Sequence, residues 1–189
     1  MAAPTPDERF REVILPHLDS AFNLACWLTR NRADAQDVVQ EAVMRAFWFF
    51  GGFRGLDGRV WLLRIVRNTF YTWCRDKTAQ PATAFDEALH SLEEANQAAA
   101  DRAGPEALLM QKDGDRAVHL ALAALPLEFR EVVVMRELEE LSYKEIAAIV
   151  GIPIGTVMSR LGRGRKLLAN SLGGTDQGGT DHGSIGQGE

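Results

Sequence analysis

Apolar residues recur every three or four positions along most of this chain, the spacing of one face of an α-helix. Strict alternation of apolar and polar residues is absent, and no hairpin turn lies between β-branched runs. The spacing predicts helices over 7–15, 17–30, 34–50 and 58–76, and then over 114–124, 127–139, 143–150 and 154–170. We therefore expect an all-α protein.

The breaks between these helices carry Pro and Gly. Pro16 separates the first two helices because it has no N–H to donate and clashes with the preceding turn. Four glycines in the stretch FFGGFRGLDG separate the third helix from the fourth. Pro126 stands where a helix start tolerates proline.

Two segments lack the apolar residues that a packed core needs. Residues 78–115 are rich in Ala, Glu and Asp and carry a net charge of −6, and the tail from 173 is rich in Gly. We therefore expect two small helical domains, at 1–77 and 114–172, joined by a flexible acidic linker at 78–113. A disordered Gly-rich tail would then occupy 173–189.

Composition favours a cytoplasmic globular protein. The chain has 189 residues, of which 46% are hydrophobic and 25% charged, as in ordinary globular domains. No apolar run reaches the roughly 18 residues that a membrane span needs, and the first residues lack a signal peptide pattern. Cys26 and Cys74 lie far apart and fit neither a disulfide framework nor a metal site. We expect a cytoplasmic location without direct membrane association.

Enzymatic chemistry has no support in the sequence. The four histidines are scattered without metal-ligand spacing, and no Gly-rich phosphate loop or nucleophile motif is present. We therefore expect no catalytic residue, no metal and no cofactor.

The segment 141–166, LSYKEIAAIVGIPIGTVMSRLGRGRK, predicts a helix-turn-helix. Ser142 with Glu145 forms a capping-box pattern that starts a helix. Gly151 ends that helix, because Gly enters the left-handed conformation at low cost, and Pro153 precedes the next one. The second helix of such a unit enters the DNA major groove.

The helix over 154–170 carries four basic residues and no acid. Its apolar positions Ile154, Val157, Leu161 and Leu168 should face the core. The opposite side carries polar and basic residues, which make the candidate duplex-DNA contacts: Thr156, Ser159, Arg160, Arg163 and Lys166. The alternative is an ordinary solvated face. Gly162 and Gly164 lower the helix propensity, so the end of this helix is expected to fray.

The helix over 58–76 has a second mixed face. Leu62, Val66, Phe70 and Trp73 should pack inward. The other side and the preceding loop combine cations, flat aromatics and an amide: Arg54, Arg59, Trp61, Arg64, Asn68, Tyr71 and Arg75. Aromatics stack on unpaired bases and cations follow the phosphate backbone, so this face is a candidate for single-stranded DNA. The alternative is an aromatic-rich core helix with snorkelling arginines.

The helix over 34–50 has a different character. Val39, Val43, Ala46 and Phe50 should be buried. A neighbouring stripe holds acids beside Met and Trp: Asp37, Gln40, Glu41, Met44 and Trp48. Acids repel phosphates, so this stripe favours a protein partner. In the alternative, the Met and the Trp belong to the core.

Three motifs carry a family resemblance: RADAQDVVQEAVMRAF, VWLLRIVRNTFYTWCR and LPLEFREVVVMRELEELSYKEIAAIVGIPIGTVMSRL. They resemble regions 2 and 4 of the extracytoplasmic-function (ECF) group of bacterial sigma factors, in the right order, over 8–77 and 114–170. The resemblance implies a transcription initiation subunit that binds core RNA polymerase and directs it to promoters.

The resemblance also implies residue roles. Asp37, Gln40, Glu41 and Met44 match the helix that docks on the clamp helices of the polymerase largest subunit. The second domain would bind the flap of the second subunit. Asn68 matches a position implicated in −10 element recognition on the opened strand, and the helix from Ile154 matches the −35 recognition helix. Members of the group are commonly held inactive by an anti-sigma factor.

Other functions explain less of the chain. A stand-alone helix-turn-helix repressor or activator accounts for 114–170 but not for the aromatic and basic helix over 58–76. A response-regulator output domain would require an α/β receiver, and the sequence has no such pattern. Binding to core polymerase distinguishes a sigma factor from a repressor.

Overall fold

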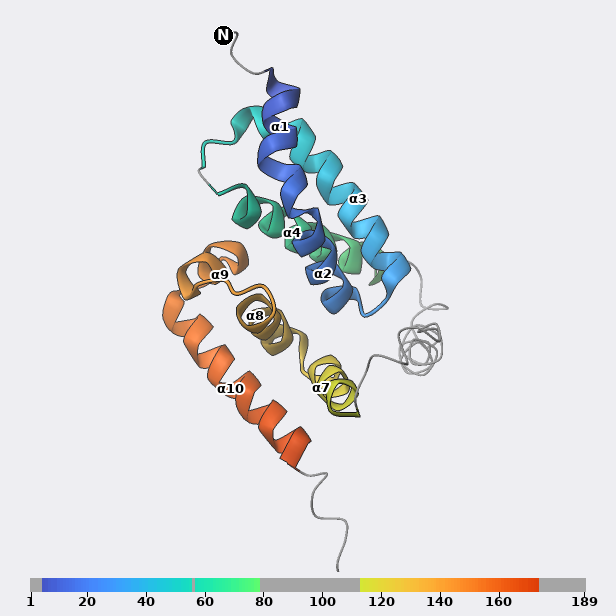
Figure 1. Cartoon of the computed structure of the whole chain (residues 1–189), viewed down its shortest axis with the longest axis vertical. Coiled ribbons are helices and arrows are strands. Elements are labelled where there is room, and N and C mark those ends of the chain that lie inside the picture. Colours follow the sequence, from blue (N-terminus) through green and yellow to red (C-terminus); the bar gives the residue numbers. More distant parts are fainter. Residues whose placement is uncertain (1–4, 56, 79–112, 174–189) are drawn as a thin grey trace, which may run out of the picture.

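The computed structural model describes residues 5–55, 57–78 and 113–173, and every regular element in these ranges is helical (Figure 1). The first group comprises α1 (Pro6–Ile14), α2 (Leu18–Thr29), α3 (Arg32–Phe49) and α4 (Gly58–Thr78), with short 3-10 helices at Leu15–His17 and Phe50–Gly52. The second comprises α7 (Asp113–Ala124), α8 (Leu127–Glu137), α9 (Tyr143–Val150) and α10 (Ile154–Gly173). The predicted all-α fold is confirmed.

Local signals set the helix ends. Thr5 and Glu8 form a capping box at the start of α1, and Asn31 accepts hydrogen bonds from two backbone N–H groups at the start of α3. Between them, α2 ends at Arg30, whose φ of 58° is left-handed and turns the chain into α3. These short-range contacts explain why the sequence located the helices to within a few residues.

The first helical unit packs α2, α3 and α4 against one another, with α1 on α4 (Figure 1). The predicted inward residues Leu62, Val66 and Phe70 of α4 are buried, and Trp73 is half-buried. Of the four residues predicted to be buried on the third helix, Ala46 and Phe50 are buried, whereas Val39 and Val43 are only half-buried. The other core residues of α3 are Ala35, Val38 and Ala42. Small alanines on this face let α3 lie close to its neighbours.

The second unit is a helix-turn-helix packed on α8. Ser142 and Glu145 form the predicted capping box, and Gly151 ends α9 in the left-handed conformation with φ of 76°. Ile146, Val157 and Leu161 are buried in the shared core. The core position predicted for Ile154 was wrong. It is the first residue of α10 and 45% exposed, one turn before the helix meets the core at Val157.

The fraying expected at the end of the recognition helix was also wrong, because α10 continues to Gly173. Gly164 is buried where α10 crosses α8. A Cβ added there would lie 2.7 Å from Cγ2 of Val133 and 3.4 Å from Cβ of Phe129. Gly164 thus allows a close helix crossing whose packing outweighs its low helix propensity. Gly162 has open space around it, so it makes no such contact.

The two units lie side by side, with α8 between α10 and the first group (Figure 1). Helix α2 packs on α8 and α4 packs on α9. The Trp27 ring stacks on His119 of α7, with centroids 5.1 Å apart and planes at 20°. This contact between the units decides which candidate functional side chains face solvent.

Two predicted segments lie largely outside the described residues: the flexible linker over 78–113 and the disordered tail over 173–189. Among the described helices, none is by itself long and apolar enough to cross a membrane. The α9–α10 pair meets that test only jointly, on length and composition, and is bent by 102°.

Candidate nucleic-acid and polymerase interfaces

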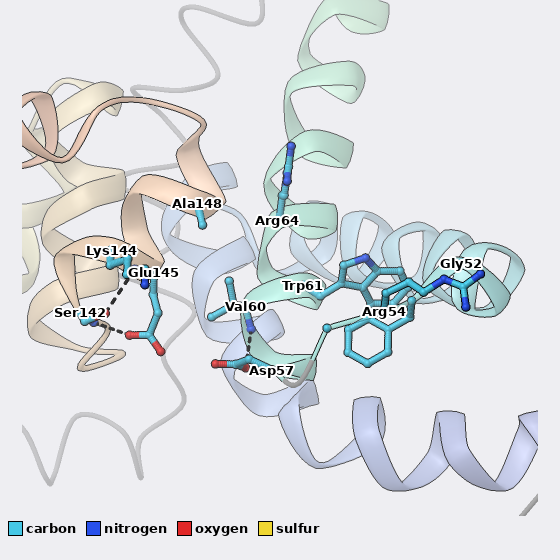
Figure 2. A pocket seen from close by; sticks show the side chains of 12 residues that line it. Gly52, Arg54, Asp57, Val60, Trp61, Arg64, Ser142, Lys144, Glu145 and Ala148 are labelled. Atoms are coloured by element: carbon cyan, nitrogen blue, oxygen red, sulfur yellow. Dashed lines mark hydrogen bonds between the residues drawn. The ribbon is translucent and has the colours of Figure 1, made fainter.

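A groove of about 650 Å³ opens where the loop before α4 and the first turns of α4 face α9 (Figure 2). Arg54, Trp61 and Arg64 line it from the first unit, and Ser142 and Lys144 line it from the second. Three of the seven side chains predicted to contact single-stranded DNA therefore share one surface. Packing of the second unit against the first brings Lys144 to the same surface, which the sequence alone did not predict.

The lining of this groove carries three cations and two carboxylates, which is a net positive charge. Arg54, Arg64 and Lys144 have no ion-pair partner in the described part of the chain. The two acids of the groove are engaged locally: Asp57 accepts a hydrogen bond from the Val60 N–H at 3.0 Å, and Glu145 accepts one from the Ser142 N–H at 2.6 Å (Figure 2). The three free cations can therefore bind phosphate groups.

Trp61 is held in an aromatic cluster at the edge of this groove. Its ring lies 5.1 Å from that of Phe53 and 6.2 Å from that of Phe50, measured between centroids. Phe50 and Phe53 are buried, while Trp61 is half-buried. The cluster fixes the indole while leaving part of it open, which suits stacking on a base.

The remaining residues predicted on the α4 face divide into two sets. Arg64, Asn68 and Arg75 are exposed, and no described side chain pairs with them. Arg59 and Tyr71 instead bind carboxylates of the second unit. The exposed set is available to a ligand, and it is also what an aromatic-rich core helix with snorkelling arginines would show. The paired set binds carboxylates instead.

Glu131 of α8 binds side chains from two other helices. Its carboxylate accepts from Arg67 Nε at 2.8 Å, Arg67 Nη2 at 3.1 Å and the Tyr71 hydroxyl at 3.1 Å, all from α4. Arg160 Nη1 of α10 donates to it at 3.4 Å. The Glu131 side chain is 0% exposed. A buried carboxylate with three cationic or hydroxyl partners is satisfied, whereas losing those partners would be costly.

This arrangement shifts the ionisation of its members. Burial, followed by the charge of Glu131, raises the pKa of Tyr71 to about 12. Burial alone would lower the pKa of Arg67, but the hydrogen bond and charge of Glu131 outweigh it, so the pKa of Arg67 is raised. Both groups therefore keep their protons at neutral pH.

A second carboxylate, Glu139, repeats the pattern just after α8. It accepts from Arg59 Nη2 of α4 and from Asn23 Nδ2 of α2, and its side chain is 5% exposed. Arg59 Nε also donates to the Ser20 hydroxyl at 3.2 Å. Sequence reasoning missed Glu131, Glu139 and Arg67. Each looks like an ordinary charged position in an amphipathic helix, and only the packing of distant helices pairs them.

The predicted duplex-binding face of α10 is mostly open. Ser159, Arg163 and Lys166 are exposed and have no ion pair with any described residue. Thr156 and Arg160 are half-buried, and Arg160 Nη2 also lies 3.3 Å from Glu128. Thus the structure groups the five residues along one helix but holds Arg160 toward α8.

The predicted polymerase-binding stripe on α3 faces solvent. Asp37, Gln40, Met44 and Trp48 are exposed, and Trp48 is 67% exposed, so the alternative that places Met44 and Trp48 in the core is wrong. Glu41 is half-buried and pairs with Arg45 at 2.7 Å.

Phe49, also 67% exposed, widens the apolar end of this stripe, although helical spacing does not place it on the same line as Met44. Exposed aromatics beside acids are typical of protein-binding surfaces.

Among the described residues, no group of three or more His, Cys, Asp or Glu is arranged to hold a metal ion. Cys26 and Cys74 are half-buried, and burial raises the pKa of each thiol.

Family models match both helical units. The model described as Sigma-70 region 2 matches residues 13–80, and that described as Sigma-70, region 4 matches residues 115–168. The chain is 33% identical over 171 residues to the ECF RNA polymerase sigma factor SigE of Mycolicibacterium smegmatis, covering 90% of this chain and 63% of that protein's length. It is 34% identical over 141 residues to the ECF RNA polymerase sigma-E factor of Escherichia coli K12, covering 74% of each.

Solved structures share the fold. The sigma factor RpoE of Bartonella quintana, in complex with the anti-sigma factor NepR, matches with a TM-score of 0.65 and 24% identity over 87% of this chain and 97% of that chain. CnrH, in complex with the cytosolic domain of CnrY, matches with a TM-score of 0.58 and 23% identity over 90% of this chain and 91% of that chain. By the family models and the curated relatives, the chain therefore belongs to the ECF group of RNA polymerase sigma factors, with the region 2 match over α2–α4 and the region 4 match over α7–α10.

Proposed function

We propose that this sigma factor binds core RNA polymerase in the cytoplasm, recognises −35 and −10 promoter elements and promotes DNA opening at a stress- or signal-responsive set of promoters. Its working parts would be a region 2 domain over 1–77, a linker over 78–113, a region 4 domain over 114–172 and a tail over 173–189. Membership of the ECF group supports the general role, and the surfaces described above support the division of tasks.

The single observation that carries the proposal is the groove at the start of α4. Three cations that have no ion-pair partner among the described residues surround it, together with a fixed, partly open indole. Cations that follow a phosphate backbone, beside an aromatic that stacks on a base, are what an unpaired DNA strand requires. Asn68 lies one turn beyond Arg64 on the exposed face of α4, so an amide is available to read a base edge.

Helix α10 would read duplex DNA at the −35 element. Ser159, Arg163 and Lys166 already face solvent, and Arg160 would join them once released from α8. The α3 stripe of Asp37, Gln40, Glu41 and Met44 would dock on the clamp helices of the polymerase largest subunit, and region 4 would bind the flap of the second subunit. The separation of acidic and basic surfaces supports this assignment, because each surface repels the wrong partner.

Control by an anti-sigma factor is part of the proposal. RpoE, which shares this fold, was co-crystallised with the anti-sigma factor NepR, and CnrH, which also shares it, was solved in complex with the cytosolic domain of CnrY. The anti-sigma factor would determine which signal releases the protein, and α10 would help to determine which promoters it selects. The partner and the promoters are to be identified by experiment.

The test is in-vitro transcription with core polymerase, this chain and a promoter library. We expect a subset of promoters with a shared −35 and −10 pattern to give transcripts that depend on the chain. The Asn68→Ala variant should give far fewer of them. A stand-alone repressor or activator would bind duplex DNA without core polymerase and give no new transcripts, and that result would refute the proposal.

A further inference from the structure

We propose that Met158 of α10 determines part of the promoter specificity, by packing its thioether side chain against the C5-methyl group of a thymine in the major groove of the −35 element. The inference rests on the proposed function and deepens it, because it names a base that α10 would select and the chemistry that selects it. It concerns an exposed side chain that the predicted set of duplex contacts omits.

Met158 is exposed on the part of α10 that is expected to meet DNA bases. Its side chain is 55% exposed, the highest value among the large apolar residues described in the second unit. It lies one turn after Ile154, the first residue of α10. In a helix-turn-helix, the N-terminal residues of the second helix contact the base edges. Met158 therefore lies at the end of α10 where a side chain can select a base.

The helix surface around Met158 carries little side-chain bulk. Gly155 precedes it by three residues and Gly162 follows it by four, so both are its neighbours on the helix surface. A Cβ added to either glycine would meet nothing within 4 Å. Because these two positions have no side chain, the backbone of α10 can approach the base pairs closely there. Met158 projects from this bare surface, with the exposed Ile154 one turn away.

The charges near Met158 favour DNA as its partner. The next residue, Ser159, is exposed, as are Arg163 and Lys166 further along, and α10 contains no acid. The other exposed methionine, Met44 on α3, has the opposite surroundings, because it shares a stripe with acids that repel phosphates. The cations of α10 can hold phosphates and so fix the position of the helix on the duplex.

Thymine is the base that an apolar side chain can select in the major groove. It presents a methyl group there, whereas the other bases present only hydrogen-bond donors and acceptors or a bare ring edge. Methionine is unbranched and has three rotatable side-chain bonds, so it can adapt its shape to a methyl group. Burying one methyl group corresponds to an affinity gain of about fourfold. Met158 would thus add a preference that the hydrogen-bonding side chains of α10 do not supply.

The test removes the methyl group from the DNA and the methionine from the protein, separately and together. The probe is the −35 duplex selected with core polymerase and the full chain, with each thymine replaced in turn by deoxyuridine, which lacks only the methyl group. Competition against a fluorescent promoter fragment measures the affinity. At one thymine, we expect the wild-type holoenzyme to bind the deoxyuridine duplex about fourfold more weakly. The Met158→Ala holoenzyme should bind both duplexes equally.

Three further variants separate methyl recognition from other effects. Met158→Leu keeps an apolar side chain and should retain most of the preference for thymine. Met158→Lys adds a cation, so it should bind every duplex more tightly and lose the preference. Leu167→Ala is the matched control, because it removes another exposed apolar side chain of α10, 40% exposed and far from the first turn. It should leave the thymine preference unchanged.

An identical thymine preference in wild type and Met158→Ala, at every thymine of the selected element, would overturn the inference, as would a selected element without thymine. An equal loss of affinity for selected and scrambled duplexes in Met158→Ala would also overturn it, because Met158 would then be a general contact. The proposed function fails separately. It is refuted if the wild-type holoenzyme does not prefer any −35 duplex over a scrambled one, whereas normal −35 selection without a methyl effect refutes only the role of Met158.

Discussion

Identical residues three positions apart on one helix behave differently in this protein, according to the face on which they lie. On α4, Arg67 binds the buried Glu131, whereas Arg64 is exposed and unpaired in the described part of the chain. On α10, Arg160 binds the same carboxylate, whereas Arg163 faces solvent. The comparison shows that a basic stripe in a sequence contains both DNA contacts and structural ion pairs, and that the position of a distant acid separates them.

The same contrast holds for acids and glycines. Glu131 is buried among cations, while Glu128, three residues earlier on α8, is 53% exposed beside Arg160. Gly164 is pressed against Val133, while Gly162 has open space. Each pair offers a substitution and its matched control within one helix, so the contrast can be tested directly.

The largest expected effect concerns the two glutamates. Glu131→Gln should lower the free energy of unfolding by about 2 kcal/mol, because removing one member of a buried ion pair strands its partners. Opening of the interface limits the loss, since an open chain lets water solvate the stranded groups. Glu128→Gln should cost less than about 0.5 kcal/mol, as for an exposed pair. Urea denaturation followed by circular dichroism compares the two variants. Equal losses in the free energy of unfolding would mean that the buried Glu131 and the exposed Glu128 contribute alike to stability.

The two arginines of α10 come next. Arg160→Ala should relax preference at one base position of the −35 element, at a cost of about 1–2 kcal/mol. The net loss is reduced because the substitution also weakens the contact with Glu131. Arg163→Ala should weaken binding to all sequences alike, by about 0.5–1 kcal/mol. Competition binding against a set of single-base variants of the duplex measures both, and a uniform loss with Arg160→Ala would make Arg160 a phosphate contact.

The α3 stripe holds another pair, Asp37 and Glu41. Asp37 is exposed with no ion-pair partner among the described residues, while Glu41 is partly neutralised by Arg45. Asp37→Ala should weaken binding to core polymerase by about 1 kcal/mol and Glu41→Ala by about half as much, since a paired charge contributes less to a new partner. Fluorescence titration of core polymerase gives both affinities. An unchanged affinity for both variants would remove the stripe from the polymerase interface.

The smallest effects concern the glycines of α10. Gly162→Ala should raise the free energy of unfolding by about 0.5 kcal/mol, because Ala has the higher helix propensity and meets no neighbour. Gly164→Ala should lower it by about 0.5–1 kcal/mol, since the clash with Val133 exceeds the propensity gain. Thermal denaturation followed by circular dichroism decides the signs. Stabilisation by both substitutions would mean that α10 does not press on α8 at Gly164.

Local signals in the sequence predicted most of the fold. Ser142 with Glu145 and the left-handed Gly151 fixed the helix-turn-helix, because capping and turn contacts involve neighbours in the chain. The sequence was less successful in predicting which side of each helix is buried. On α3, Ala46 was correctly predicted as buried while Val39 and Val43 are only half-buried, and Ile154 proved exposed, because neighbouring helices decide which side of a helix is covered.

The sequence predicted which residues are candidate DNA contacts, but only partly which of them are exposed and free to bind DNA. The sequence identified Arg160 and Tyr71 as candidate DNA contacts, and both lie on the expected helices. It gave no sign that Glu131 would hold them, because 60 and 29 residues separate that acid from Tyr71 and Arg160. Pairing over such distances follows from the packing of the two units, which no local pattern encodes.

The most direct test of the central claim is permanganate reactivity of thymines in the −10 region of a selected promoter. With core polymerase and the wild-type chain, we expect reactive thymines, which mark an opened strand. Asn68→Ala should abolish most of this reactivity and leave binding to the −35 duplex unchanged, because Asn68 lies on α4 in region 2 and not on α10. If no thymine is reactive with the wild-type chain at any selected promoter, the account is contradicted. If Asn68→Ala opens the promoters normally, the proposed role of α4 in strand opening is contradicted.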